Sequence, residues 1–119
     1  MNPILIGDRM AKNSVKAIQL KSIDVSTISA ITWVAFDELE EACSLIRITN
    51  NSDTGVLVSF NGTDDHEVVM DGSTVELNLQ ANSSPNNNVS KIKKGTVLYL
   101  SGTAGTGYVY LSGYYNELD

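Results

Sequence analysis

The chain has 119 residues, of which 42% are hydrophobic and 18% are charged. This size and composition indicate one folded domain with a single hydrophobic core, and they exclude a disordered acidic chain. The formal net charge of −6 also excludes a protein that follows nucleic-acid phosphates, because such proteins need clustered lysine and arginine.

Residues 1–14 are expected to form an extended arm that packs on a neighbouring molecule, and residues 15–119 to form a single domain. The arm carries a short apolar patch that includes Ile4, Leu5 and Ile6. This patch is too short for a secretory signal peptide, and no apolar run approaches the ~20 residues that span a bilayer. We therefore expect synthesis in a cytoplasm and no membrane partner.

An alternation of apolar and polar residues with period two dominates the domain and is typical of half-buried β-strands. In residues 45–49, for example, Ile46 and Ile48 share one face, whereas Arg47 and Thr49 share the other. Other segments are rich in the β-branched and aromatic residues that strands favour. In chain order, strands are expected at residues 15–21, 29–36, 45–49, 56–60, 74–79, 96–100 and 108–115. A further short strand is expected to begin at His66.

Short segments rich in asparagine, aspartate and glycine separate these strands. Asparagine and glycine supply the positive-φ positions that tight hairpins need, so hairpin turns are expected at residues 50–55, 61–65, 70–73, 93–95 and 102–107. The segment DELEEA, residues 37–42, is too short to be more than a turn or a bulged crossover. About eight short strands at this spacing predict an all-β fold, an antiparallel β-sandwich that resembles a jelly roll.

Residues 80–95 form an almost wholly polar segment that is long for a connection in a small sandwich. Loops longer than ~12 residues are usually functional or mobile. Two interpretations stay open, a surface connection without a role and a loop that contacts a neighbouring subunit through Asn86, Asn87 and Asn88.

The stretch VSFNGTDDHEVV, residues 58–69, places the single histidine, His66, directly after Asp64 and Asp65. A catalytic triad is disfavoured because the chain has no strand-turn-helix nucleophile elbow. A metal site is disfavoured because the acids lack the spacing of a calcium loop, and because zinc needs more histidine or cysteine ligands. We interpret the stretch as a hairpin and expect no catalytic residue, metal or cofactor.

Cys43 is the single cysteine of the chain. This count excludes an internal disulfide and a zinc site built from several cysteines, and it fits a reducing compartment. A buried, inert thiol is the expected role of this side chain.

Tyr108, Tyr110 and Tyr114 fall on one face of the last expected strand, and Tyr99 lies on the strand before it. Planar aromatic side chains on a sandwich face can stack on sugars, and tyrosine is also enriched in protein interfaces. The single tryptophan, Trp33, lies within the apolar segment ITWVAF, where we expect it to pack in the core. The tyrosines therefore predict a contact surface, either for another subunit or for a carbohydrate.

Two stretches of the chain carry a recurring pattern, IRITNNSDTGVLVSFNGTDDHEVVMDGSTVELNLQAN and KKGTVLYLSGTAGTGYVYLSGYY. A strand ending in I-x-N is followed by a polar turn, a strand ending in SFNG, a DH step into the next strand, and a glycine-rich segment before a final tyrosine-rich strand. In this pattern, which extends from residue 45 to residue 115, the chain resembles small virion proteins of tailed bacteriophages.

The resemblance implies a non-enzymatic structural subunit of a virion, in a head-tail connector, a tail or a capsid decoration, without cofactor or direct nucleic-acid contact. It implies assembly with other virion proteins, or with copies of the chain in a homo-oligomer or ring, through the arm, the loops and the tyrosine-rich strand. The candidate interface residues are Ile4, Leu5, Ile6, Asn86, Asn87, Asn88, Tyr108, Tyr110 and Tyr114. The alternative function is a carbohydrate-binding β-sandwich module that recognises host surface glycans on a tail fibre or baseplate.

Overall fold

The computed structural model of the chain describes residues 13–79 and 91–118 and consists of β-strands, loops and one short 3₁₀ turn, η1. The elements are β1 (Asn13–Ala17), β2 (Lys21–Asp24), η1 (Val25–Thr27), β3 (Val34–Ala35), β4 (Leu45–Ser52), β5 (Val56–Ser59), β6 (Glu67–Val69), β7 (Thr74–Asn78), β8 (Tyr99–Ser101) and β9 (Gly107–Leu118).

Six of the nine candidate interface residues lie outside the described residues. They are Ile4, Leu5 and Ile6 of the expected arm and Asn86, Asn87 and Asn88 of the expected loop. β1 begins at Asn13, so the last two residues of the segment 1–14 belong to a strand rather than to an arm.

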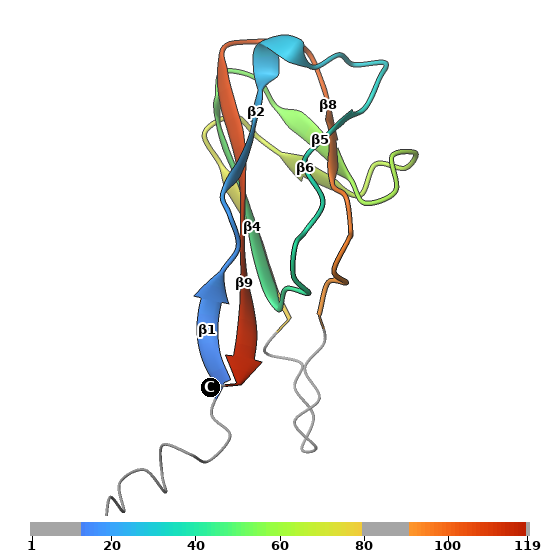
Figure 1. Cartoon of the computed structure of the whole chain (residues 1–119). Helices are drawn as coiled ribbons and strands as arrows, with labels where there is room; N and C mark the ends of the chain where they lie inside the picture. Colours follow the sequence, from blue (N-terminus) through green and yellow to red (C-terminus); the bar gives the residue numbers. More distant parts are fainter. Residues whose placement is uncertain (1–12, 80–90, 119) are drawn as a thin grey trace, which may run out of the picture.

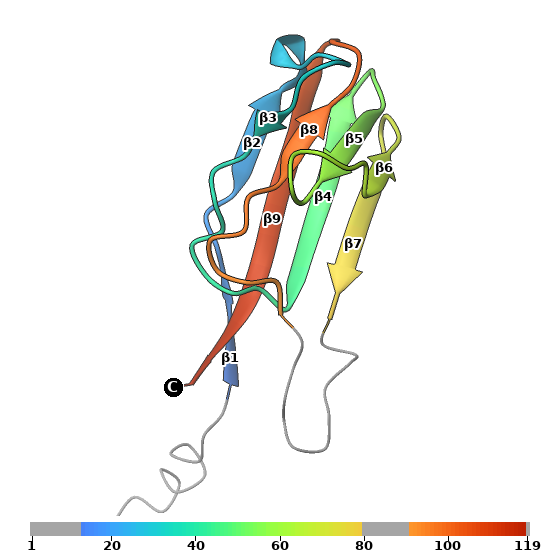
Figure 2. The same ribbon diagram turned by 90° about the vertical axis from the view of Figure 1, so that its right-hand side faces the viewer.

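Two antiparallel sheets pack face to face (Figure 1). The first sheet has the strand order β1-β9-β4-β7, and β2 pairs with the same edge of β9 as β1 does. The second sheet has the order β3-β8-β5-β6 and lies in front of the first in Figure 2. With β1 and β2 counted as one interrupted strand, this is the order of a double-sheet jelly roll, so the predicted all-β sandwich is confirmed.

The core lies between the sheets and follows the predicted period of two. Ile46 and Ile48 of β4 point inward and are almost completely buried, whereas Arg47 and Thr49 point outward. Burying one aliphatic side chain of this size contributes about 1.5–3 kcal/mol, so the alternation supplies much of the stability of the sandwich. The buried apolar side chains are Ile18, Ile23, Val25, Ile28, Phe36, Leu39, Cys43, Ile46, Ile48, Val56, Val58, Val69, Leu98, Leu100, Val109 and Leu111.

The predicted hairpin turns have two different roles in the structure. The turn at residues 61–65 joins β5 to β6, which pair with each other, as expected of a hairpin. The turns at residues 50–55, 70–73 and 102–107 instead carry the chain from one sheet to the other. The hairpin interpretation was wrong at these three turns, because asparagine and glycine determine a local bend and not the sheet that the next strand joins.

One glycine is required where the last of these turns leads into β9. Gly107 has φ +118°, a conformation that residues with a side chain rarely adopt. A Cβ at this position would also collide with the backbone oxygen of Asn51 on the neighbouring strand β4. Glycine therefore allows β9 to pair with β4 from its first residue.

A β-bulge interrupts the strand that was expected at residues 15–21. Ala17 pairs with Tyr114 and Lys21 pairs with Leu111, so four residues of one strand span the same distance as three residues of β9. The extra residue bends the strand and separates β1 from β2. The strand expected at 29–36 is also shorter, because only Val34–Ala35 pairs within the second sheet.

Glu40, which lies in the connection between β3 and β4, binds the residues of the bulge. Its carboxylate accepts hydrogen bonds from the backbone N–H of Gln19 (2.9 Å) and from Nζ of Lys21 (2.7 Å). The bond from Lys21, followed by the bond from Gln19, lowers the pKa of Glu40 from an ordinary value near 4.5 to about 2. On the other side of the bulge, the Ile18 N–H donates to the backbone oxygen of Gly113 (3.0 Å).

Residues 91–98 pair with the connection between β3 and β4 through backbone hydrogen bonds. Cys43 and Ile92 exchange two such bonds, of 2.9 and 2.7 Å, and the Leu39 N–H donates to the oxygen of Thr96 (2.9 Å). The described end of the segment 80–95 is therefore tied to the sandwich. Cys43 is fully buried, as expected, and burial raises the pKa of its thiol, which keeps it in the unreactive protonated form.

Asn50 joins three parts of the chain at one end of the sandwich. The side chain is 1% exposed, and its Nδ2 donates to the backbone oxygens of Thr54 (2.8 Å) and Val69 (3.0 Å). Its Oδ1 accepts a hydrogen bond from Ser52 Oγ (2.5 Å), and its backbone oxygen accepts one from the Gly72 N–H (2.9 Å). This residue holds the turn after β4 against the end of β6 and the turn that leads to β7.

Replacing Asn50 by alanine is expected to lower the free energy of unfolding by about 1–3 kcal/mol, because the buried Val69 oxygen loses this donor and the Thr54 oxygen keeps only the bond from Ser52 Oγ. Urea denaturation measures this loss. Asn51→Ala is the matched control, since Asn51 is the next residue in β4 and is exposed; it should cost less than about 0.5 kcal/mol. Equal losses in the two variants would contradict the role assigned to Asn50.

The Glu40 contact predicts a stability that depends on pH. The folded-state pKa lies below the unfolded value, so the contribution of Glu40 is present above pH 4.5 and is lost as the pH falls towards about 2. Thermal melts of Glu40→Gln and of the natural chain should therefore differ at pH 6 and converge near pH 2. Glu41→Gln, at the neighbouring position, is the control and should follow the natural chain. A difference for Glu40→Gln that persists at the lowest pH would exclude this cause.

Candidate functional site

Two loops cover part of the outer face of the second sheet. They are residues 29–33, which lead into β3, and residues 60–66, which join β5 to β6. Both project from the same side of the sandwich (Figure 1). Between them, Leu57 of β5 and Ser101 of β8 lie opposite each other in the register of the sheet and point outward.

These loops and strands line a pocket of about 220 Å³ that is open to solvent, which we call the Trp33 pocket. Its floor is formed by Leu57 and Ser101, one wall by the loop that carries Trp33, and the other wall by the loop that carries Asp65. The lining residues are Ala30, Ile31, Thr32, Trp33, Leu57, Thr63, Asp65 and Ser101.

The expectation that Trp33 packs in the core was wrong. Val34 and Phe36 pack in the core, and period two therefore turns Trp33 to the opposite, outer face of β3. The indole is half-buried and lines the pocket, and the neighbouring Ile31 is 90% exposed. The alternation within ITWVAF contains the signal that could have placed Trp33 outside the core.

Side chains of the 60–66 loop fix its conformation through hydrogen bonds to their own backbone. The buried Ser59 Oγ accepts hydrogen bonds from the N–H groups of Asn61 (3.2 Å) and Gly62 (2.9 Å). The Asn61 Oδ1 accepts from the N–H groups of Thr63 (2.8 Å) and Asp64 (2.9 Å). The wall of the pocket is therefore held in its conformation by hydrogen bonds within the loop and from Ser59.

Gly62 lets this loop lie directly on the second sheet. It has φ +75°, and a Cβ at this position would come within 3.2 Å of the Tyr99 ring. Tyr99 thus lies beneath the loop on the outer face of the second sheet, and not beside Tyr108, Tyr110 and Tyr114 on the first. The grouping of the four tyrosines into one sandwich surface was wrong, because β8 and β9 belong to different sheets.

His66 has a structural role in the hairpin. Its Nδ1 accepts a hydrogen bond from the Phe60 N–H (3.0 Å), and its ring lies edge-on to the Phe60 ring at a centroid distance of 5.8 Å. The Asp64 carboxylate accepts from Asn61 Nδ2 (2.9 Å) instead of contacting the imidazole. Among the described residues, no three acidic, histidine or cysteine side chains lie close enough together to hold a metal ion.

Three of the four tyrosines of β9, Tyr108, Tyr110 and Tyr114, lie on the outer face of the first sheet, whereas Tyr115 packs against the core. Tyr108 and Tyr110 stack with ring centroids 6.1 Å apart, and Tyr108 is 45% exposed. Beside them on β4, Arg47 donates two hydrogen bonds, of 2.9 and 3.3 Å, to one carboxylate oxygen of Glu76 on β7. We call Tyr108, Tyr110, Tyr114, Arg47 and Glu76 the tyrosine face.

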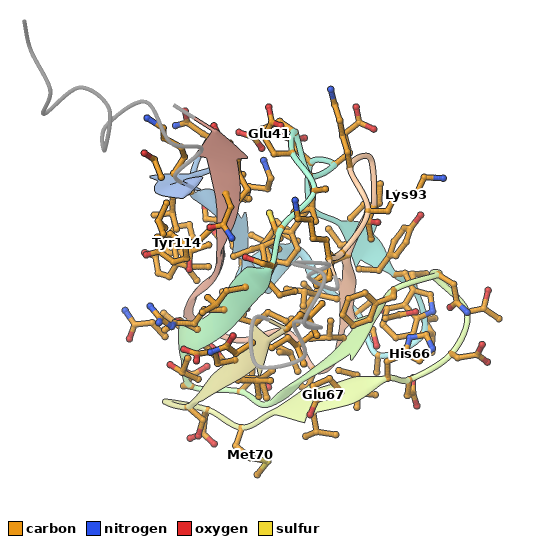
Figure 3. All side chains as sticks on the ribbon, turned by 90° about the horizontal axis from the view of Figure 1, so that it is seen from below. Glu41, His66, Glu67, Met70, Lys93 and Tyr114 are labelled. Carbon is orange, nitrogen blue, oxygen red and sulfur yellow. The ribbon has the colours of Figure 1, made fainter. Side chains whose placement is uncertain are left out.

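Arg47 links the charged and aromatic parts of the tyrosine face. The hydrogen bond to Glu76 and its negative charge raise the pKa of Arg47, with a smaller contribution from Tyr114. Tyr114 and His66 lie on opposite sides of the sandwich in Figure 3, as expected for side chains from the outer faces of the two sheets. The tyrosine face and the Trp33 pocket are therefore two separate surfaces.

Comparisons with known proteins add no functional assignment. No protein-family model matches the chain, and no curated protein matches it. Among solved structures, a crystal structure of PirA is similar at 12% sequence identity and a TM-score of 0.38, over 87% of this chain and 93% of the PirA chain. A likeness of this degree supports no argument about function. In the part of the chain that the structure describes, no helix is long and apolar enough to cross a membrane.

Asn61→Ala is expected to loosen the pocket wall, because the N–H groups of Thr63 and Asp64 lose their acceptor. Amide hydrogen exchange at these two positions should become about tenfold faster while the core amides keep their protection. Thr63→Ala is the control, since it keeps the bond from its own N–H to Asn61. Unchanged exchange in Asn61→Ala would show that the loop is held by other contacts.

Proposed function

We propose that the chain is a non-enzymatic structural protein of a tailed-phage virion and that it assembles with neighbouring subunits through the tyrosine face. The observation that carries this proposal is the stacked pair of Tyr108 and Tyr110 on the outer face of the first sheet, where Tyr108 is 45% exposed and Tyr110 is half-buried. Tyrosine offers a large apolar ring with a hydrogen-bonding hydroxyl, which suits a protein interface. Stacking limits the conformational freedom of the two rings, so less side-chain entropy is lost when a partner binds.

The ion pair of the tyrosine face suits the border of such an interface. The side chains of Arg47 and Glu76 are 40% and 41% exposed, so the pair adds little to the stability of the isolated chain. Charges in this position act mainly on the orientation and choice of a partner. Arginine and tyrosine are also the residue types enriched in protein interfaces.

Two further points support the virion role. Double-sheet jelly rolls occur in viral capsid proteins and also in lectins, an analogy at the level of the fold. The resemblance of residues 45–115 to small virion proteins of tailed phages favours the first of these classes over the second. The lectin class is the alternative, and the Trp33 pocket is the observation that favours it.

The double variant Tyr108→Ala with Tyr110→Ala tests this assembly surface. It should fold, because both side chains lie outside the core, but its incorporation into particles should fall to about one-tenth or less, the effect of losing central interface residues. Quantitative mass spectrometry of virions purified from cells that express the variant in place of the natural chain measures this fraction.

Val68→Ala with Met70→Ala is the matched control, since these apolar side chains, on β6 of the second sheet and directly after it, are 53% and 59% exposed. This control should be incorporated normally. Absence of the natural chain from purified virions would overturn the virion role. Normal incorporation of the tyrosine variant would leave that role intact but overturn the assigned surface.

A further inference from the structure

We infer that the Trp33 pocket binds a single neutral sugar ring of a glycan. This inference is independent of assembly through the tyrosine face, because the pocket lies on the outer face of the other sheet. It combines four properties of the pocket: an available aromatic surface, polar groups without protein partners, a suitable size, and a negative charge.

The aromatic surface is the indole of Trp33. It is half-buried, which fixes its position, and it faces the pocket beside the exposed Ile31. The C–H groups on one side of a pyranose ring form an apolar patch that packs on such a surface. Tyr108 and Tyr110 are less suited to this contact, because each already stacks on the other.

The polar groups around the indole are left free by the protein. Ser101 is 4% exposed and points into the pocket from its floor, yet no described residue forms a hydrogen bond with its hydroxyl. No described residue binds the Asp65 carboxylate either. The neighbouring side chains of Ser59 and Asn61 are by contrast fully engaged within the loop. No buried side-chain oxygen among the described residues lacks a partner, so the unpaired Ser101 hydroxyl is open to the pocket, where a hydroxyl group of a sugar would form a hydrogen bond with it.

The size and charge of the pocket define the ligand further. About 220 Å³ is below the ~300–1,000 Å³ of pockets that enclose drug-sized molecules, so the space suits one ring and not a long ligand. The lining includes the carboxylate of Asp65 and neither lysine nor arginine. An acidic sugar would be repelled by this charge, whereas the hydroxyl groups of a neutral sugar donate hydrogen bonds to the carboxylate.

The pocket wall is also pre-organised, which lowers the entropy lost on binding. Asn61 and Ser59 hold the backbone of residues 61–64, directly before Asp65, and Gly62 rests on the Tyr99 ring beneath it. Little of the loop has to be ordered when a ligand arrives. An open-chain polyol carries the same hydroxyl groups without the ring, so the test includes one as a comparison ligand.

Trp33 is the single tryptophan of the chain, so its fluorescence reports directly on the pocket. The full chain is titrated with the methyl glycosides of glucose, galactose, mannose and N-acetylglucosamine. At least one should change the emission in a saturable manner, with a dissociation constant of about 1 mM, as expected for a ligand of roughly a dozen non-hydrogen atoms. Sorbitol, glucuronic acid and sialic acid serve as comparison ligands and should produce no saturable change.

Variants locate the site by calorimetry with the glycoside that binds. Trp33→Ala, Asp65→Asn and Ser101→Ala should each weaken binding at least about tenfold, whereas Tyr108→Ala with Tyr110→Ala, on the other sheet, should leave it unchanged. Circular dichroism checks the fold, and Asp65→Asn keeps the test valid if Trp33→Ala does not fold, because Asp65 is exposed. The inference is overturned if no neutral glycoside binds, if sorbitol or the acidic sugars bind as well, or if binding survives Asp65→Asn and Ser101→Ala.

Discussion

The backbone pairing of β9 is the interaction on which the first sheet depends. One edge of this strand pairs with β4 and the other with β1 and β2, so β7 is the only strand of the described sheet that does not contact it directly. Its alternation places Val109 and Leu111 in the core and Tyr108, Tyr110 and Tyr114 on the opposite face. Because β9 lies at the end of the chain and its partners at the beginning and in the middle, the sheet closes only when distant segments meet, which is slow and costs entropy. The same strand therefore determines the core, the exposed aromatic surface and the long-range order of the fold.

Local patterns in the sequence were sufficient for the fold class but not for the arrangement of the sheets. The alternation of Ile46 and Ile48 with Arg47, and the glycines and asparagines of the turns, predicted strands and bends correctly. The sheet that each strand joins depends on contacts between distant residues, and for this reason three bends that were expected as hairpins prove to be crossovers. The bulge before Lys21 has no local signal, since it is set by the register with β9 and by a carboxylate from a different loop. The alternation along residues 33–36 could have placed Trp33 on the outer face, because Val34 and Phe36 share the face that points to the core. The apolar character of the whole segment was a weaker guide.

The residues that carry the resemblance to virion proteins have structural roles in this chain. Asn50 of the I-x-N pattern is a buried hydrogen-bonding side chain, Asn61 and Gly62 of SFNG shape the hairpin loop, and Gly107 allows the close approach of β9 to β4. In this chain these residues therefore shape the turns of the sandwich and the close approach of two strands. The tyrosine face and the Trp33 pocket are built from other residues, most of which lie before Asn50 or after Gly107 in the chain.

The placement of these two surfaces on opposite sheets has a consequence for any assembly of the chain. A subunit held by its tyrosine face would leave its pocket open on the other side, so a ring or lattice would carry one symmetry-related pocket per copy. A single pocket with a millimolar affinity would be too weak to retain a ligand. Many such pockets facing a glycan-coated surface would act together, and avidity of this kind can exceed the affinity of one site by roughly 10²–10⁴-fold. The jelly roll would then serve as an adaptor, with one sheet turned towards the particle and the other towards the surface that the particle meets.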